Sequence, residues 1–382
     1  MKVRASHIFA VFLFVLSTAT FVFLIPAIYG DKAGNMDFIS YWAAGKQLSH
    51  GENPYDIEAT FRLQRGAGLT ENSPDMLLNM PNALILFLPL GLVSAKTGMA
   101  VWLLTSILCL MASIRMLWIL FGRPDNALHL LGFVFAPVIA CLFAGQLGMF
   151  LLFGVVLFLY FHESRPFWAG AALLLCTLKP HLFLAFGIVV LAWLLNRRAY
   201  RILAGAATFL IGNLAVTYFV DPHAWSEYTR LMNDYGIQRA FVPALSVVFR
   251  LLVDRDAVWL QYVPALAACG WGLWYFSSRR DRWSWMHHGL LLLLVSEACA
   301  PHAYLPDEVI VLPAILASLY RTRNPGRVLL TYCTLTGIVL IEIANHLKLT
   351  SILYLWTAPA WLALYLYAHH NKSVLTDELV TA

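Results

Sequence analysis

The chain has 382 residues, of which 60% are hydrophobic and only 12% are charged. Soluble domains usually carry roughly a quarter charged residues, so this composition excludes an ordinary soluble protein. The net charge is +5, but the basic residues cluster between apolar segments, as membrane-topology signals do, and nothing favours nucleic-acid binding. Apolar runs recur along the whole chain, and helices satisfy their own backbone hydrogen bonds in lipid. We therefore predict an all-α polytopic membrane protein.

The first apolar segment, residues 7–29, follows the basic start Met1-Lys2-Val3-Arg4. A cleaved signal peptide has similar flanks. This run is longer than the apolar core of a signal peptide, however, and it lacks a clear small-x-small cleavage site before Asp31. We therefore expect an uncleaved first membrane span.

Thirteen further apolar segments follow, several of them too short to span a bilayer alone. They lie near residues 81–93, 97–121, 127–143, 147–161, 167–178, 180–195, 201–219, 241–253, 257–276, 287–299, 303–320, 327–343 and 350–368. The basic clusters at 197–201, 279–282 and 321–327 should face the cytoplasm. Successive loops must lie on opposite sides of the membrane, and this is possible only if segments 81–93 and 241–253 do not cross the bilayer.

The resulting expectation is a single transmembrane domain, residues 1–382, of about 12 spans with both termini in the cytoplasm. Its outer loops are residues 31–80 and 220–256, and residues 369–382 form a cytoplasmic tail. In the first outer loop, helical spacing over Asp37–Gly51 and Pro54–Gly66 predicts two short amphipathic helices. Such helices lie along the membrane surface.

Asp37 stands just after the first apolar segment, in the run Met36-Asp37-Phe38. Acidic residues at a membrane interface are costly and are often kept for chemistry, transport or pairing with a cation. A simpler explanation is that Asp37 caps the helix beginning at Phe38, a position that favours Asp. The residues alone leave both roles open.

Other polar residues stand at breaks between apolar runs. Gln146 follows Gly145 and either contacts a substrate hydroxyl or phosphate or satisfies the loop. Lys179-Pro180-His181 offers an anion site, although snorkelling also explains the lysine. His302 and Asp307 flank a proline-rich break and are typical of a polar wall. Their spacing matches no metal-binding signature.

Taken in order, these landmarks resemble glycosyltransferase family 87, a family of polyprenyl-phosphate-mannose-dependent mannosyltransferases with the GT-C fold. The resemblance extends to about residue 320. Its landmarks are Asp37-Phe38 with Tyr41, Gly51 with Pro54-Tyr55-Asp56, Pro81 with Pro89-Leu90, Gly145-Gln146, Ala169-Gly170 leading to Lys179-Pro180, and Pro301-His302 with Asp307. The chain departs from the family pattern at one of these landmarks. Many family members have Tyr-Pro-Pro at the position where this chain has Asn79-Met80-Pro81-Asn82.

The resemblance implies a glycosyltransferase of the inner (plasma) membrane, with its active site on the periplasmic side. A polyprenyl-phosphate-linked sugar would be the donor, a glycolipid or glycan the acceptor, and no metal or other cofactor would be needed. Asp37 would act as the general base of an inverting displacement, and Lys179 and His302 would stabilise the leaving phosphate. His181, Gln146, Asp307 and Tyr41 would contact the sugar or phosphate or orient these groups. A flippase or transporter of lipid-linked sugars, or an oligosaccharide polymerase or ligase, is the alternative.

Overall fold

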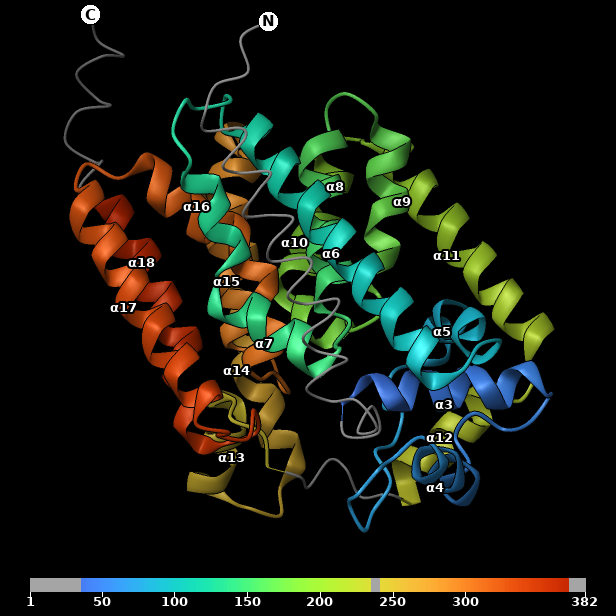
Figure 1. Cartoon of the computed structure of the whole chain (residues 1–382). Coiled ribbons are helices and arrows are strands. Elements are labelled where there is room, and N and C mark those ends of the chain that lie inside the picture. Colours follow the sequence, from blue (N-terminus) through green and yellow to red (C-terminus); the bar gives the residue numbers. More distant parts are fainter. Residues whose placement is uncertain (1–35, 235–240, 371–382) are drawn as a thin grey trace, which may run out of the picture.

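The computed structural model describes residues 36–234 and 241–370. The expected first span, 7–29, and residues 371–382 of the expected tail lie outside the described residues. The described part is helical throughout and contains no strand (Figure 1). The predicted all-α class is therefore confirmed.

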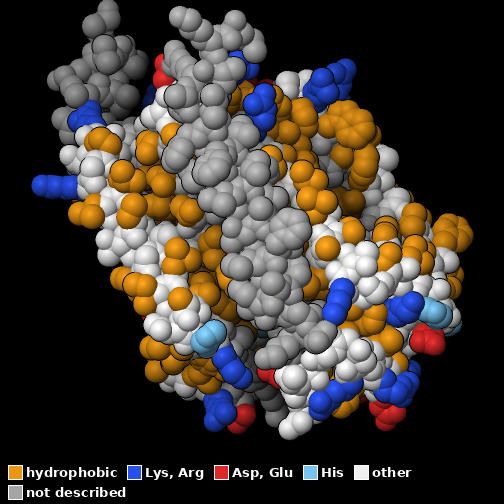
Figure 2. All heavy atoms as spheres, viewed as in Figure 1, with side chains coloured by type: hydrophobic (Ala, Val, Ile, Leu, Met, Phe, Trp, Pro, Cys, Tyr) orange, Lys and Arg blue, Asp and Glu red, His pale blue; other side chains and the backbone are white. Residues whose placement is uncertain are grey.

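Three helices are long and apolar enough to cross a membrane: α6 (Ala95–Leu120), α11 (Tyr200–Val220) and α17 (Pro325–Ala344). Figure 1 shows them running along the length of the molecule. In Figure 2, hydrophobic side chains dominate the described part of the visible face between its two ends, while most acidic and basic side chains lie toward those ends. This distribution is typical of a protein whose middle part lies in the hydrocarbon core of a bilayer. The count of about 12 spans stays a prediction.

Most remaining apolar segments form shorter helices, many of them broken near a proline. A proline interrupts a helix because it lacks an N–H donor and clashes with the preceding turn. These elements are η4 (Leu128–Phe133), α7 (Ala136–Ala144), α8 (Gly148–Phe161), α9 (Pro166–Cys176), η5 (Pro180–Phe183), α10 (Leu184–Asn196), η7 (Val258–Tyr262), α14 (Val263–Ser277), η9 (Trp285–Gly289), α15 (Leu290–Ala298), η10 (Leu305–Val311), α16 (Leu312–Arg321), η11 (Ile352–Tyr354) and α18 (Thr357–His370). Between α14 and η9 lies the short charged turn η8 (Arg280–Arg282).

The first outer loop folds into a compact group of short helices at one end of the bundle. The loop contains α3 (Phe38–Ser49) and α4 (Ile57–Gly66). The next segment, η3 (Pro81–Ala83) and α5 (Leu84–Gly91), packs against α3, and α12 (Ala224–Asp234) contacts η3 (Figure 1). The turn before α4 is built as its sequence suggests, because the Asp56 carboxylate accepts a hydrogen bond of 2.7 Å from the Ala59 N–H and so caps the helix.

One feature of this group differs from the expectation. The first short helix, α3, was expected to be amphipathic, with one polar face exposed, but ten of its twelve residues are buried. It packs against α4, α5 and α6 because its apolar and small side chains point to all sides. Only α4 has the exposed polar face expected of a surface helix, with Thr60 and Gln64 as its two buried residues.

The two segments that were expected not to cross are short. Residues Pro81–Gly91 form η3 and α5, about 16 Å at the rise of a helix, against a hydrocarbon core of about 30 Å. The other segment contributes only α13 (Leu245–Val253). Neither is long enough to span a bilayer alone.

The crossing of α3 and α5 depends on two glycines. A Cβ atom added at Gly45 would lie 2.1 Å from the Phe87 carbonyl oxygen, and one at Gly91 would lie 2.1 Å from the Gly45 carbonyl carbon and oxygen. No side chain fits at such distances, so the backbones touch directly, as small residues allow between membrane helices. This contact fixes α3, and with it Asp37, against the bundle.

We predict that Gly91→Ala lowers the stability of the protein by about 1–3 kcal/mol, the usual cost of overpacking, because the new methyl group must push α3 and α5 apart. Gly187→Ala in α10 is the matched control, since a Cβ there meets open space and alanine favours a helix. Thermal unfolding in detergent measures both variants. Equal unfolding temperatures for the two would refute the close packing of α3 on α5.

Candidate active site

The site is organised around the break between α7 and α8. Gly145 ends α7 with a φ of +68°, a left-handed conformation that favours glycine. A Cβ at this position would also lie 2.7 Å from Cβ of Phe38. The Trp102 indole N–H donates a hydrogen bond of 2.8 Å to the Gly145 carbonyl. The break is therefore held in one conformation, and the next residue, Gln146, is presented to α3.

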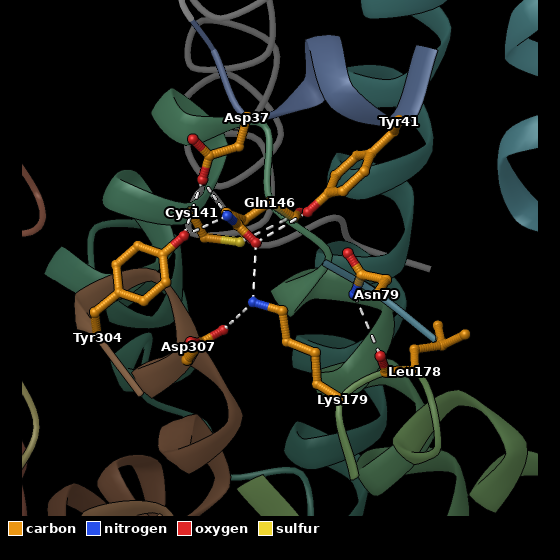
Figure 3. A network of polar contacts seen from close by, with 9 residues as sticks. All are labelled: Asp37, Tyr41, Asn79, Cys141, Gln146, Leu178, Lys179, Tyr304 and Asp307. Atoms are coloured by element: carbon orange, nitrogen blue, oxygen red, sulfur yellow. Dashed lines mark hydrogen bonds and ion pairs between the residues drawn. The ribbon is translucent and has the colours of Figure 1, made fainter. Parts of the chain in front are cut away.

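The Gln146 side-chain amide joins three other segments of the chain (Figure 3). Its Oε1 accepts hydrogen bonds from the Tyr41 hydroxyl and from Lys179 Nζ, each 3.0 Å long. Its Nε2 contacts Asp37 Oδ2 and the Tyr304 hydroxyl. An amide has two lone pairs and two N–H groups to offer, and all four directions are occupied. The amide thus places the carboxylate on its nitrogen side and the ammonium group on its oxygen side.

The side chain of Asp37 is not the helix cap that its position suggested. Asp37 precedes α3 with helical backbone angles, φ −56° and ψ −25°, and its carboxylate makes no cap hydrogen bond to the described helix. It accepts a hydrogen bond of 2.9 Å from the Tyr304 hydroxyl instead. Burial raises the pKa of Asp37, while hydrogen bonds from Gln146 and Tyr304 and the nearby Lys179 charge oppose that rise. Asp37 as a whole residue is half-buried, in contrast to Asp307, which is fully buried.

Lys179 and Asp307 form a buried ion pair, with 2.6 Å between Nζ and Oδ1. Lys179 is 9% exposed and Asp307 is fully buried, so Asp307 contacts the lysine and does not reach a substrate from its present position. Breaking such a pair is costly, since it leaves a buried charge uncompensated. The lysine Nζ also lies 5.6 Å from the centre of the Tyr304 ring, within cation–π range.

The two histidines lie beside this network without joining its hydrogen bonds. The His181 and His302 rings meet edge to face at 5.9 Å, and His302 meets Tyr304 at 6.4 Å. Burial lowers the pKa of His302, so its imidazole is neutral near pH 7. It therefore offers a hydrogen bond and no positive charge. The His181 Nε2 atom is buried and has no hydrogen-bond partner among the described residues.

Two asparagines hold the turn that carries Lys179. Asn79 Nδ2 donates to the Leu178 carbonyl at 3.3 Å, and Asn82 Nδ2 donates to the Thr177 carbonyl and hydroxyl at 3.1 and 3.0 Å. By sequence, this segment, Asn79-Met80-Pro81-Asn82, was notable only as a departure from the family pattern. The structure shows instead that its side chains fix the residues directly before Lys179.

Every residue expected at the site falls near it: Asp37, Tyr41, Gln146, Lys179 and Asp307 form one network, and His181 and His302 lie at its edge. Sequence reasoning missed Tyr304, whose only signal was its position two residues after His302. Glu308, the neighbour of Asp307, points elsewhere. It accepts hydrogen bonds from Thr357 and Trp361 and anchors α18. Among the described residues, no group of three or more His, Cys, Asp or Glu side chains is placed to hold a metal ion.

The fold and this network define a helical membrane protein with a polar site built at helix breaks. Comparison with protein families then identifies it more closely. The model of glycosyltransferase family 87 matches residues 78–301, more than half of the chain, so this protein belongs to glycosyltransferase family 87. No curated protein and no solved structure gives a significant match. The matched stretch contains Gln146 and Lys179, while Asp37 and Asp307 lie outside it.

Proposed function

We propose that this membrane glycosyltransferase moves a hexosyl group from a polyprenyl-phosphate donor to a hydroxyl group of a glycolipid or glycan acceptor. Mannose is the sugar to test first, because the family resemblance favours it. The observation that carries the proposal is the placement of a carboxylate, Asp37, and an ammonium group, Lys179, on opposite sides of one amide. A base for the acceptor and a cation for the donor phosphate are the two groups that such a transfer needs.

The reaction is a single displacement at the anomeric carbon. Asp37 takes the proton from the acceptor hydroxyl while the acceptor oxygen attacks. The bond between the anomeric carbon and the phosphate oxygen breaks as the new glycosidic bond forms, and polyprenyl phosphate leaves with the electron pair. Attack from the face opposite to the leaving group inverts the anomeric configuration. Because a phosphate is already a stable anion, it needs electrostatic stabilisation more than a proton.

On the donor side, Lys179 supplies the positive charge, and His302, with His181 behind it, supplies neutral hydrogen bonds. Asp307 keeps the lysine in position and shares its charge. Gln146 has no free hydrogen-bonding direction in this arrangement, so its role is to hold Asp37, Tyr41 and Lys179 at fixed separations. Such preorganisation is a large part of enzymatic electrostatics.

The basic clusters at 197–201 and 279–282 support an orientation with the site on the outer face of the plasma (inner) membrane. The Arg197 side chain donates to the backbone carbonyls of Arg280 and Asp281 at 3.2 and 3.4 Å, so the two clusters meet. The positive-inside rule places such a concentration of arginine in the cytoplasm. A polyprenyl-linked sugar would then reach the site from the outer leaflet.

We predict that Asp37→Asn lowers kcat/KM by about 10²–10⁴-fold, the usual contribution of a general base, because asparagine cannot take the acceptor proton. The matched control is Asp56→Asn on the same outer loop, where asparagine caps a helix as well as aspartate does. Transfer from a polyprenyl-phosphate sugar is assayed at equal amounts of folded protein. Retention of most activity in Asp37→Asn would exclude Asp37 as the base.

The raised pKa of Asp37 gives a pH dependence of defined sign. A base works only when ionised, so activity is present above the pKa and is lost as the pH falls through it. We predict an acid limb in the profile of kcat/KM whose midpoint lies above about 3.9, the ordinary value for aspartate. A midpoint at or below that value, in a protein that stays folded throughout, would contradict the assignment.

Lys179 is tested with a pair of variants, because Lys179→Ala alone leaves Asp307 buried without its counter-ion. Lys179→Met combined with Asp307→Asn removes both charges together. We predict that this double variant folds and still shows at least a tenfold increase in the KM for donor, with a smaller effect on acceptor. Normal donor use by the double variant would show that Lys179 serves only the ion pair.

A further inference from the structure

A second polar region lies at the opposite end of the same helices. α8 begins beside Gln146 and ends at Phe161, and α10 follows the Lys179 turn and ends at Asn196. Each is 13–14 residues long, so their far ends lie about 20 Å from the candidate active site. Two adjoining cavities open there, and both are lined by His162, Trp193 and Arg197.

One cavity, of about 480 Å³, is basic. Three arginines line it, Arg197, Arg198 and Arg201, and it has no acidic lining residue. Arg197 is bonded to backbone carbonyls of the neighbouring cluster, whereas no hydrogen bond or ion pair to a described residue occupies the side chains of Arg198 and Arg201. Two charged groups that have no counter-ion among the described residues thus line one pocket, where an anion would bind favourably.

The backbone presents these arginines in a specific way. Arg198 has a φ of +50°, in the left-handed region that non-glycine residues seldom adopt. This residue forms the tight turn between α10 and α11, and Arg201 follows in the first turn of α11. Glycine would be the ordinary choice at such a turn. The presence of arginine at this strained position indicates that its guanidinium group has a function.

The adjoining cavity, of about 410 Å³, is rich in aromatic residues and includes Trp193, Trp283 and Trp285 in its lining. The indole N–H groups of Trp283 and Trp285 are buried and have no hydrogen-bond partner in the described part of the chain, although a buried donor left unpaired costs free energy. Glu163 also lines this cavity, lies 3.5 Å from His162, and is highly exposed. Negative charge is therefore confined to the aromatic cavity.

We propose that this pair of cavities binds the phosphate headgroup of an anionic phospholipid, in the leaflet opposite to the candidate active site. Arg198 and Arg201 contact the phosphate, and the tryptophans line the glycerol region. Tryptophans and basic pockets between membrane helices are the features that recognise such headgroups. The lipid holds the ends of α8, α10 and α11 together. This site uses none of the residues of the candidate active site and does not rest on the proposed reaction.

The test compares lipid binding to the full-length protein by native mass spectrometry, with phosphatidylglycerol, phosphatidylcholine and inorganic phosphate as probes. The variant is Arg198→Gly with Arg201→Gln, which removes both charges and gives the turn the residue that its φ prefers. The matched control is Arg282→Gln, an exposed arginine at the same end that lines neither cavity.

The expected result is retention of phosphatidylglycerol by the wild-type protein and by Arg282→Gln, with binding at least tenfold weaker in the double variant. Phosphatidylcholine should bind at least tenfold more weakly than phosphatidylglycerol to the wild type. Equal phosphatidylglycerol binding by all three proteins would overturn the proposal. Displacement of the lipid by an equal concentration of inorganic phosphate would also overturn it, by showing a site for small anions.

Discussion

The arrangement of the site depends on one side chain, the amide of Gln146. It bonds to Asp37 and Tyr41 on the outer-loop helix, to Lys179 before η5 and to Tyr304 before η10. Gln146 is only 6% exposed, and a buried polar network is favourable only when its members are satisfied. Satisfying this one amide brings three distant segments together and fixes the spacing of a carboxylate and an ammonium group.

These polar groups all stand where helices begin or break. Such positions leave backbone and side-chain polar groups that need partners in an apolar surrounding, and here they become partners for one another. The buried pair of Lys179 and Asp307 is bonded at 2.6 Å, while Asn79 and Asn82 hold the turn before the lysine. Together, these features hold a rigid polar site inside an apolar bundle. They are the broken helices, the ion pair and the two asparagines.

The sequence was sufficient for the helical class and the family, and it also selected most of the residues that the structure brings together around Gln146. Composition, proline breaks and the order of polar landmarks carry that information. It did not distinguish a cap from a free carboxylate at Asp37, since this depends on Tyr304, which lies 267 residues away. It also predicted that α3 is amphipathic, because spacing alone does not reveal that Gly45 and Gly91 allow α5 to cover this helix. Local sequence patterns do not predict contacts between side chains that are distant in the sequence.

The most direct test is transfer by the purified protein from a polyprenyl-phosphate mannose labelled at its anomeric carbon, followed by NMR of the product. We expect polyprenyl phosphate to be released only when a glycolipid or glycan acceptor is present, and the new glycosidic bond to have the opposite anomeric configuration. Retained configuration would contradict the single displacement. Movement of intact donor across a bilayer without cleavage, in place of transfer, would contradict the proposed function itself.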